Sequence, residues 1–175
     1  LLLVGPAGTG KGTITNLVAK DLKLNQIDTG AMYRAFTLYM LDNKVELDEI
    51  EKIKELLEKV KIDLIQEDDK ETVFLNGKDV TKEIRSKSVT NFVSPVSSII
   101  EVRIKMVELQ RKMAEGKNVI MEGRDITTYV FPNANVKIYL DANVEERAKR
   151  RYKENIEKGM QTTFEEVLQD MKKRD

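Results

Sequence analysis

The 175-residue chain is long enough for one domain with a real core and an insertion, and its 30 basic and 30 acidic side chains leave no net charge, unlike a strongly basic protein that binds a nucleic-acid polymer. It contains no Cys and no His, which excludes disulfides, thiol nucleophiles, imidazole bases and zinc sites built from these residues. No stretch approaches the roughly 18 apolar residues of a membrane span and none looks like a secretory signal, so we expect a cytoplasmic protein without a membrane partner.

The first part of the chain alternates between strand and helix patterns. Residues 1–4 predict a buried strand, and residues 11–24 predict a helix, with one stripe of apolar side chains: Ile14, Leu17, Val18 and Leu22. The stretch "NQIDTG" predicts a short second strand that ends in a turn, and "AMYRAFTLYML" predicts a mostly apolar helix. This β-α-β-α order is typical of a parallel sheet with crossover helices.

The middle of the chain has a different pattern. Residues 46–60 predict a charged amphipathic helix, and residues 61–77 predict a small antiparallel hairpin around "EDDK". Residues 78–84 predict a helical turn. We therefore expect residues 43–87 to form an insertion with its own small sheet, between the two parts of a core formed by residues 1–42 and 88–175.

The last part returns to helices and strands. Residues 94–116 predict one long helix, with Pro95 in its first turn and Gly116 as its C-terminal cap. Two more strands are predicted at "NVIMEG" and "VKIYLDA", on either side of an irregular connection. A helix follows from Asn143, and the final helix starts with Thr163 and Glu166 at the spacing of a capping box.

The loop "GPAGTGKGT" carries the first functional signal, because Gly5, Gly10 and Lys11 have the spacing of a phosphate-binding loop. Glycines let successive backbone N–H groups turn toward one anion, and the helix that follows adds its positive end. An ordinary glycine-rich turn is the alternative, but the loop lies between a predicted strand and a predicted helix, as phosphate binding requires. We expect the loop to hold nucleotide phosphates through nine residues: Gly5, Pro6, Ala7, Gly8, Thr9, Gly10, Lys11, Gly12 and Thr13.

A magnesium site is expected beside this loop. The strict motif has Ser or Thr after the lysine, whereas this chain has Gly12 and then Thr13. Either Thr13 contributes its hydroxyl, or water takes that position, which Mg²⁺ tolerates. Glu122 ends a predicted strand and can hold a magnesium-bound water. Asp141 competes for this role, although we expect it to be a structural cap.

Other motifs in the chain distinguish between the types of chemistry that a phosphate-binding loop can support. The base-reading motif of GTPases is absent, since Asn43 and Lys44 are followed by Val and Glu. A kinase for a small phosphate needs no general base, because the acceptor is already an oxyanion, and catalysis then rests on positioning and charge neutralisation. Arg34 interrupts an apolar helix and Arg124 follows a strand end, so both fit that role. A solvated helix face explains the remaining cluster equally well: Arg147, Arg150 and Arg151.

These motifs together resemble the bacterial-type cytidylate kinase family within the P-loop nucleoside monophosphate kinases. The matching segments run in order along nearly the whole chain: "GPAGTGKGT", "DTGAMYRA", "FLNGKDVTKEIRS", "NFVSPVSSIIEVR", "LQRKMAEGKNVIMEGRDITTYVFPNANVKIYLDA" and "EERAKRRY". The resemblance implies the α/β P-loop NTPase fold, with a parallel sheet flanked by helices, a small inserted nucleotide-binding domain and a helical lid over about residues 150–165. It implies transfer of a phosphoryl group from ATP to CMP or dCMP, with Mg²⁺, in a monomer. The family also continues past "KKRD" with charged residues that serve the lid and the sugar.

The resemblance assigns roles to individual residues. Lys11 and lid arginines such as Arg151 would hold the ATP phosphates, and Arg34 and Arg124 would hold the acceptor phosphate. The cytosine would be surrounded by four side chains: Thr29, Ser94, Arg103 and Asp125. Asp125 can accept a hydrogen bond from the cytosine amino group, while Arg103 and Ser94 can donate to its N3 and O2. Apart from that role, Ser94 would be a helix N-cap and Arg103 a surface charge.

Uracil would place a carbonyl opposite the Asp125 carboxylate, so we expect CMP or dCMP to be preferred over UMP. Two alternatives stay open: a kinase for another nucleoside monophosphate, and a non-catalytic nucleotide-binding module on the same fold.

Overall fold

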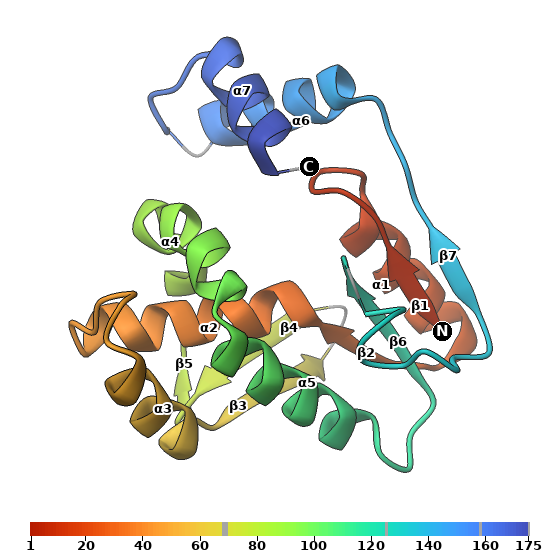
Figure 1. The fold of residues 1–175 in the computed structure, drawn as a ribbon. Helices are drawn as coiled ribbons and strands as arrows, with labels where there is room; N and C mark the ends of the chain where they lie inside the picture. The colour runs from red at the N-terminus through yellow and green to blue at the C-terminus, as the bar shows by residue number, and fades with distance from the viewer. Residues whose placement is uncertain (68–69, 125, 158, 175) are drawn as a thin grey trace.

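The computed structural model describes residues 1–67, 70–124, 126–157 and 159–174 (Figure 1). Its core is a parallel sheet with the strand order β2-β6-β1-β7. The strands are β1 (Leu2–Val4), β2 (Asn25–Asp28), β6 (Val119–Gly123) and β7 (Lys137–Tyr139). The parallel sheet predicted from the alternating pattern is confirmed. β1 lies between β6 and β7, so its carboxyl end, where the glycine-rich loop starts, is central in the sheet.

The helices of the described chain are α1 (Lys11–Leu22), α2 (Thr29–Asp42), α3 (Ile50–Lys59), α4 (Lys87–Ser98), α5 (Ile100–Ala114), α6 (Val144–Glu157) and α7 (Phe164–Arg174). Of these helices, α1 and α2 pack on this sheet, and α6 and α7 lie away from it (Figure 1). α2 is the most deeply buried of the helices, since Met32, Ala35 and Phe36 are fully enclosed. None of these helices has the length and the apolar character needed to cross a membrane.

The apolar stripe predicted for α1 is not where the helix is buried. Leu17 and Leu22 are about 60% exposed, whereas α1 buries the smaller Thr15 and Ala19. Small side chains let the helix lie close to the sheet, so the close approach of α1, rather than its hydrophobic periodicity, decides which face is covered.

The region expected to be an insertion contains a second sheet of three antiparallel strands: β3 (Ile62–Glu67), β4 (Lys70–Leu75) and β5 (Lys78–Asp79). The predicted hairpin is confirmed, and residues 68–69 of its expected turn lie outside the described residues. The helical turn expected over residues 78–84 is wrong at its start, because β5 occurs there and only η1 (Glu83–Arg85), a 3-10 helix, follows. Asn76 and Gly77 both have positive φ (50° and 82°), which is the tight turn that sends β5 back along β4.

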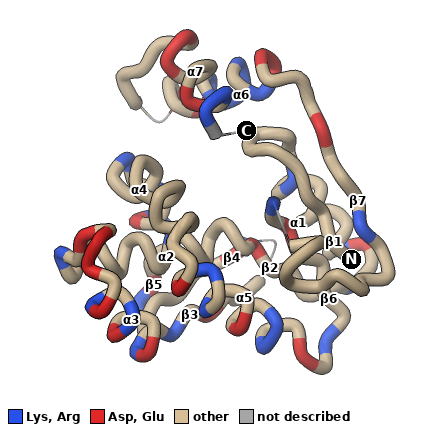
Figure 2. Tube along the Cα trace, viewed as in Figure 1, with Lys and Arg blue, Asp and Glu red and all other residues tan. Residues whose placement is uncertain are grey.

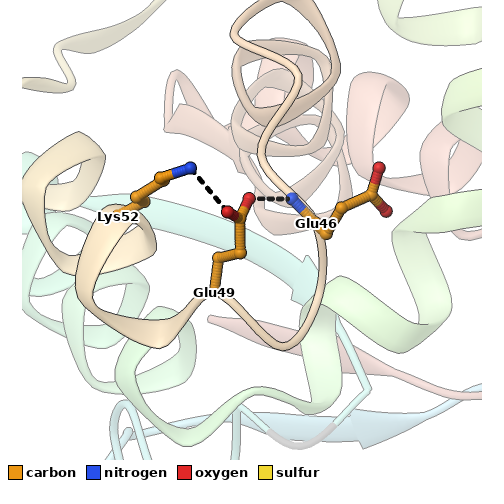
Figure 3. A network of polar contacts seen from close by, with 3 residues as sticks. All are labelled: Glu46, Glu49 and Lys52. Carbon is orange, nitrogen blue, oxygen red and sulfur yellow. Dashed lines mark hydrogen bonds and ion pairs between the residues drawn. The ribbon is translucent and has the colours of Figure 1, made fainter.

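α3 packs against α5 and α2, and it carries charges of both signs along its length (Figure 2). Its start is closed by Glu49, whose carboxylate accepts a hydrogen bond from the backbone N–H of Glu46 at 2.9 Å and pairs with the Lys52 ammonium at 2.5 Å (Figure 3). These bonds lower the pKa of Glu49. The network lies at the surface, with the Lys52 and Glu49 side chains 62% and 31% exposed, so it directs the chain into α3 more than it stabilises the fold.

One long helix over residues 94–116 was expected, and this is wrong: α4 and α5 occupy the region. α4 starts well before Pro95, with Ser86 as its N-cap. Pro95 therefore lies inside α4, and Ser94 is a helical residue rather than an N-cap. Gly116 follows the end of α5 with a φ of 69°, as expected for a residue that ends a helix.

α4 ends at Ser98, and the next residue, Ile99, has an extended backbone (ψ 126°). The serine hydroxyls of Ser97 and Ser98 donate to the carbonyl oxygen of Ser94 at 2.8 and 3.1 Å. Proline removes one N–H from a helix and crowds the preceding turn. The hydroxyl bonds of Ser97 and Ser98 also compete with the backbone hydrogen bonds that would continue the helix. Both effects favour the end of α4 here, and the chain changes direction between α4 and α5.

α6 and α7 form a helical hairpin beyond the glycine-rich loop (Figure 1). A small cluster of buried apolar residues holds the two helices together: Ala148, Val167 and Met171. The predicted capping box at the start of α7 is confirmed. Thr163 N–H donates to the Glu166 carboxylate at 2.8 Å, and Glu166 N–H donates to the Thr163 hydroxyl at 3.2 Å.

Candidate active site

The glycine-rich loop joins β1 directly to α1, which is the context that phosphate binding requires. Gly5, Gly8 and Gly10 have φ values of 148°, 78° and 92°, so each adopts a conformation that other residues avoid. A Cβ atom on Gly5 would lie 2.0 Å from the carbonyl oxygen of Leu140, which leaves no space for a side chain. The loop therefore needs glycine both for its turns and for its close packing beside β7.

Lys11, the first residue of α1, folds back over this loop. Its ammonium donates to the carbonyl oxygens of Gly5 and Pro6 at 2.8 and 2.6 Å. Burial lowers the pKa of Lys11, and the neighbouring Arg124 and Arg147 act in the same direction, whereas the Glu122 and Asp28 carboxylates oppose the shift. A partly desolvated ammonium held against carbonyl oxygens is well placed to exchange them for the stronger charge of a phosphate.

Arg147 is buried, with 3% of its surface exposed, so a solvated helix face, one of the two interpretations left open for the arginine cluster, does not hold for this residue. Its guanidinium donates to the carbonyl oxygen of Ala7 at 3.0 Å and to that of Ala142 at 2.9 Å. Met171 of α7 also reaches the loop, because a Cβ atom on Gly8 would lie 2.8 Å from the end of its side chain. The α6–α7 hairpin thus contacts the glycine-rich loop directly, and Figure 2 shows Lys and Arg positions along α6.

Glu122 lies one residue before the end of β6, beside the start of α1, and is 8% exposed. Its two carboxylate oxygens lie 3.6 and 3.8 Å from the place that a Cβ atom would take on Gly12. A Cβ atom at Gly12, the departure from the strict motif, would make only ordinary van der Waals contact with this carboxylate, so the Glu122 side chain lies directly beside the start of α1. Burial raises the pKa of Glu122 to about 7, and nearby Asp28 adds to the shift, whereas Lys11 opposes it.

A third carboxylate reaches the same place from the inserted sheet. Glu71 of β4 lies near Asp28 and Glu122, and burial, reinforced by those two carboxylates, raises its pKa to about 8. Arg85 opposes the shift. The Oε1 atom of Glu71 is buried and has no hydrogen-bond partner among the described residues. Nothing in the sequence pattern indicates this contact, because β4 is antiparallel and belongs to the insertion.

Replacing Glu71 by Gln is expected to stabilise the protein at alkaline pH. At pH values below the ordinary pKa of about 4.5, the Glu71 carboxyl is protonated in both the folded and the unfolded chain. In that range it does not change the free energy of unfolding with pH. Between pH 4.5 and 8 the unfolded chain releases the proton while the folded chain keeps it, so the wild type loses stability as pH rises. We expect Glu71→Gln to raise the free energy of unfolding by about 2 kcal/mol at pH 8.5, after allowing for partial exposure.

Urea denaturation of both proteins at pH 4.5 and 8.5 measures this difference, with the exposed Glu67→Gln on β3 as the matched control. A gain of equal size at both pH values, or none at pH 8.5, would contradict the role assigned to the Glu71 carboxyl.

A cleft of about 520 Å³ opens beside these residues and joins several parts of the fold. The residues expected at a nucleotide site that line it are Ala7, Gly8, Lys11, Thr29, Arg34, Ser94, Arg103, Glu122, Arg124 and Arg151. They come from the glycine-rich loop, α2, α4, α5, the end of β6 and α6. The two arginines singled out in the sequence analysis, Arg34 and Arg124, thus lie on the same cleft as Lys11.

Hydrogen bonds hold two of the lining side chains in place. The Thr29 hydroxyl donates to the carbonyl oxygen of Glu122 at 2.7 Å, which ties the start of α2 to the end of β6. The Arg34 guanidinium donates to the carbonyl oxygen of Ile84 at 3.1 Å and to the Thr90 hydroxyl at 3.0 Å. Arg34 is therefore paired with neutral acceptors from the insertion and α4, which answers the cost of placing a charge in an apolar helix.

The outcome differs for Thr13, Asp125 and Asp141. Thr13 is exposed on α1 and is not among the described lining residues. Asp125 lies outside the described residues. Asp141 accepts a hydrogen bond from the N–H of Ala142 at 2.8 Å, which is consistent with the structural cap expected for it.

Other lining residues were missed in the sequence analysis: Asp28, Gly30, Tyr33, Val93, Ser97, Ser98 and Gly123. For the serines a signal exists, because Ser94, Ser97 and Ser98 have the spacing of one helix face. The helix that makes this spacing meaningful starts at Lys87, earlier than predicted. Asp28 likewise ends a strand of the sheet, although its visible role is to cap α2 by accepting a hydrogen bond from Ala31 N–H.

The comparison with known proteins agrees with this geometry. A family model described as cytidylate kinase matches residues 2–175. A cytidylate kinase of Fusobacterium nucleatum is 50% identical over 171 residues, which cover 98% of this chain and 77% of that protein. Cytidylate kinases of Halalkalibacterium halodurans and Bacillus subtilis are 48% and 47% identical over the same share of this chain, covering 77% and 76% of their own lengths. The resemblance and the fold predicted from the sequence are confirmed: the chain belongs to the cytidylate kinase family.

Proposed function

We propose that this protein transfers the γ-phosphoryl group of ATP to CMP or dCMP, giving ADP and CDP or dCDP. The observation that carries the proposal is the single cleft on which Lys11 of the glycine-rich loop faces Arg34 and Arg124. Such a cleft suits two phosphate-bearing molecules at once. The family to which the chain belongs supports the same reaction.

The reaction needs positioning and charge neutralisation more than proton transfer. An oxygen of the acceptor phosphate attacks the γ-phosphorus of ATP, and the bond between that phosphorus and the β,γ-bridging oxygen breaks, so that the electron pair leaves with ADP. Lys11 neutralises charge on the donor, and Arg34 and Arg124 hold the acceptor phosphate in line. Arg151, whose guanidinium now lies 3.3 Å from Glu154, closes over the transferring group with the hairpin. No histidine is needed, since the acceptor oxygen carries no proton that must be removed.

Mg²⁺ fits this site as an ion held mainly by phosphate oxygens and water. Among the described residues, no group of three or more acidic, His or Cys side chains is arranged to hold a metal alone. The buried Glu122 carboxylate beside Gly12 suits an ion that is held through a bound water. Bound there, Mg²⁺ would neutralise developing charge on the phosphates. Thr13 is the other candidate, although its exposed position on α1 supports the water-mediated alternative.

The base is read by polar groups around the far end of the cleft. Ser94 and Arg103 line it, and Asp125 follows directly after Arg124 in the chain. We propose that Arg103 and Ser94 donate to N3 and O2 of cytosine while Asp125 accepts from the amino group, with Thr29 beside the ring. Residues 43–87 would bind the nucleoside monophosphate, and about residues 150–165 would form the lid of a cytoplasmic monomer.

UMP is expected to be a poorer substrate than CMP by about 5- to 150-fold in kcat/KM. Uracil places a carbonyl against the Asp125 carboxylate, and an unpaired buried polar group costs about 1–3 kcal/mol. A coupled assay of ADP release with CMP, dCMP, UMP and AMP measures the preference. Equal turnover of UMP would refute the base-reading scheme, a preference for AMP would indicate another nucleotide kinase, and no turnover of any acceptor would indicate a module that only binds.

A further inference from the structure

A second cavity, of about 200 Å³, lies next to the cleft between α5 and the segment that follows β6. It shares Thr29, Tyr33 and Arg103 with the cleft. Its remaining lining residues are Ile100, Ile104, Val107, Gln110, Ile126, Tyr129 and Val130. We call it the inner cavity. The α5 residues in this set follow a helical spacing, so one face of α5 forms its wall.

The inner cavity runs from an exposed apolar rim to a buried polar floor. At the rim, Ile100, Ile104 and Tyr129 are 69%, 65% and 62% exposed. At the other end, Ile126 and Gln110 are 2% and 1% exposed. Large apolar side chains gathered around an opening favour a partly apolar ligand over bulk water.

Gln110 is the feature that indicates a specific ligand. Its Nε2 atom is buried and has no hydrogen-bond partner among the described residues. A buried amide N–H without a partner is costly, and buried polar groups are normally satisfied. In α5 the other buried positions, such as Val102 and Met106, are apolar. An amide placed among them and next to a cavity is satisfied by an acceptor atom that enters from that cavity.

The lining also indicates the charge of the ligand. Arg103 is the one charged side chain among the described lining residues, and its guanidinium stacks 5.4 Å from the centre of the Tyr129 ring. A cation–π contact of this kind already offsets part of its charge. Besides Arg103 and the Gln110 amide, the described lining consists of apolar residues and of the hydroxyl-bearing Thr29, Tyr33 and Tyr129. With no further cation among them, the cavity suits a neutral molecule better than a phosphate.

The volume limits the size of the ligand. An engineered apolar cavity of about 150 Å³ is known to hold benzene, and the inner cavity is somewhat larger. We propose that the inner cavity is a second ligand site, distinct from the nucleotide cleft, that takes a flat, neutral, single-ring molecule whose carbonyl oxygen accepts a hydrogen bond from Gln110 Nε2. Because Arg103 and Thr29 form the shared wall, such a molecule sits directly behind the site proposed for the base.

The experiment compares 2-pyridone, a flat ring with a carbonyl oxygen, with toluene, which has the same number of non-hydrogen atoms but no acceptor. Each is titrated into the protein while backbone amide signals of α5 are followed by NMR. Saturable binding of 2-pyridone is expected in the wild type. Gln110→Leu is expected to weaken 2-pyridone at least fivefold and to change toluene less than twofold, because only the donor is lost.

Two further variants keep the test decisive. Gln66→Leu replaces an exposed glutamine of β3 and is expected to bind both probes as the wild type does. Ile104→Trp changes an exposed rim residue, so it is expected to fold even if Gln110→Leu does not, and to weaken both probes by filling the opening. Equal binding of 2-pyridone to the wild type and to Gln110→Leu would overturn the proposal, as would no saturable binding or an unaffected Ile104→Trp.

A final titration separates the inner cavity from the cleft. With CMP at saturation, monitored through amide signals of α2 and α4, 2-pyridone is expected to bind still. Its displacement by CMP would make the inner cavity a part of the base site and would overturn the proposal. The titrations with 2-pyridone need no catalysis, so they decide the inner cavity even if CMP is neither bound nor phosphorylated.

Discussion

Lys11→Ala is expected to lower kcat for phosphorylation of CMP by about 10²–10³-fold, the range found when one group that stabilises transition-state charge is removed. The reason is the position of Lys11 at the start of α1, where its partly desolvated ammonium rests on two carbonyl oxygens of the loop. We expect these neutral acceptors to be exchanged for phosphate oxygens when ATP binds. In a low-dielectric setting the charge is then worth more than on an exposed surface.

Steady-state kinetics of purified Lys11→Ala measures this effect, and Lys20→Ala is the control. Lys20 lies on the same helix, is exposed and does not line the cleft. Its variant is expected to keep the wild-type kcat. Both variants are expected to keep a circular dichroism spectrum close to that of the wild type, because the turns of the loop depend on glycine. A Lys11→Ala enzyme with a normal rate would show that the donor phosphates bind elsewhere.

Arg34→Ala is expected to have the second-largest effect, lowering kcat/KM for CMP by about 10–10²-fold. A charge-assisted hydrogen bond contributes about 1.5–3 kcal/mol. The guanidinium lines the cleft and is positioned by the carbonyl oxygen of Ile84 and the hydroxyl of Thr90. The acceptor phosphate would pair with the positive charge of Arg34. Loss of the Arg34 side chain is therefore expected to weaken the binding of CMP and to leave the binding of ATP nearly unchanged. The KM for ATP is expected to change less than threefold.

Thr90→Val separates the role of Arg34 in binding from its role in the fold. This variant removes one of the two positioning acceptors and keeps the arginine, so we expect less than a fivefold loss in kcat/KM for CMP. Initial rates over a grid of ATP and CMP concentrations distinguish the two substrates. If Arg34→Ala raised the KM for ATP and left that for CMP unchanged, Arg34 would belong to the donor and the proposed assignment would be wrong.

The elements that local patterns determine were predicted well. The glycine-rich loop could be placed between a strand and a helix because glycine, lysine and the flanking apolar run act over about ten residues. The capping box of Thr163 and Glu166 is likewise a contact within one turn, and both of its hydrogen bonds occur. Local rules were misread at Asn76 and Gly77, where an Asn-Gly pair directs a third strand, and at Pro95, which does not start its helix.

The sequence by itself determined the alternating strand and helix order and the position of the glycine-rich loop. It also identified Arg34 and Arg124 as candidate site residues. Each of these inferences depends on neighbours along the chain. The tertiary structure alone decided that Arg147 is buried against Ala7, which lies far away in the sequence. It alone brought Glu71 of the inserted sheet to the carboxylates at the strand ends of the core. The free energy of a charge depends on what surrounds it in space, through desolvation and through partners from other elements, and a one-dimensional pattern does not contain those distances.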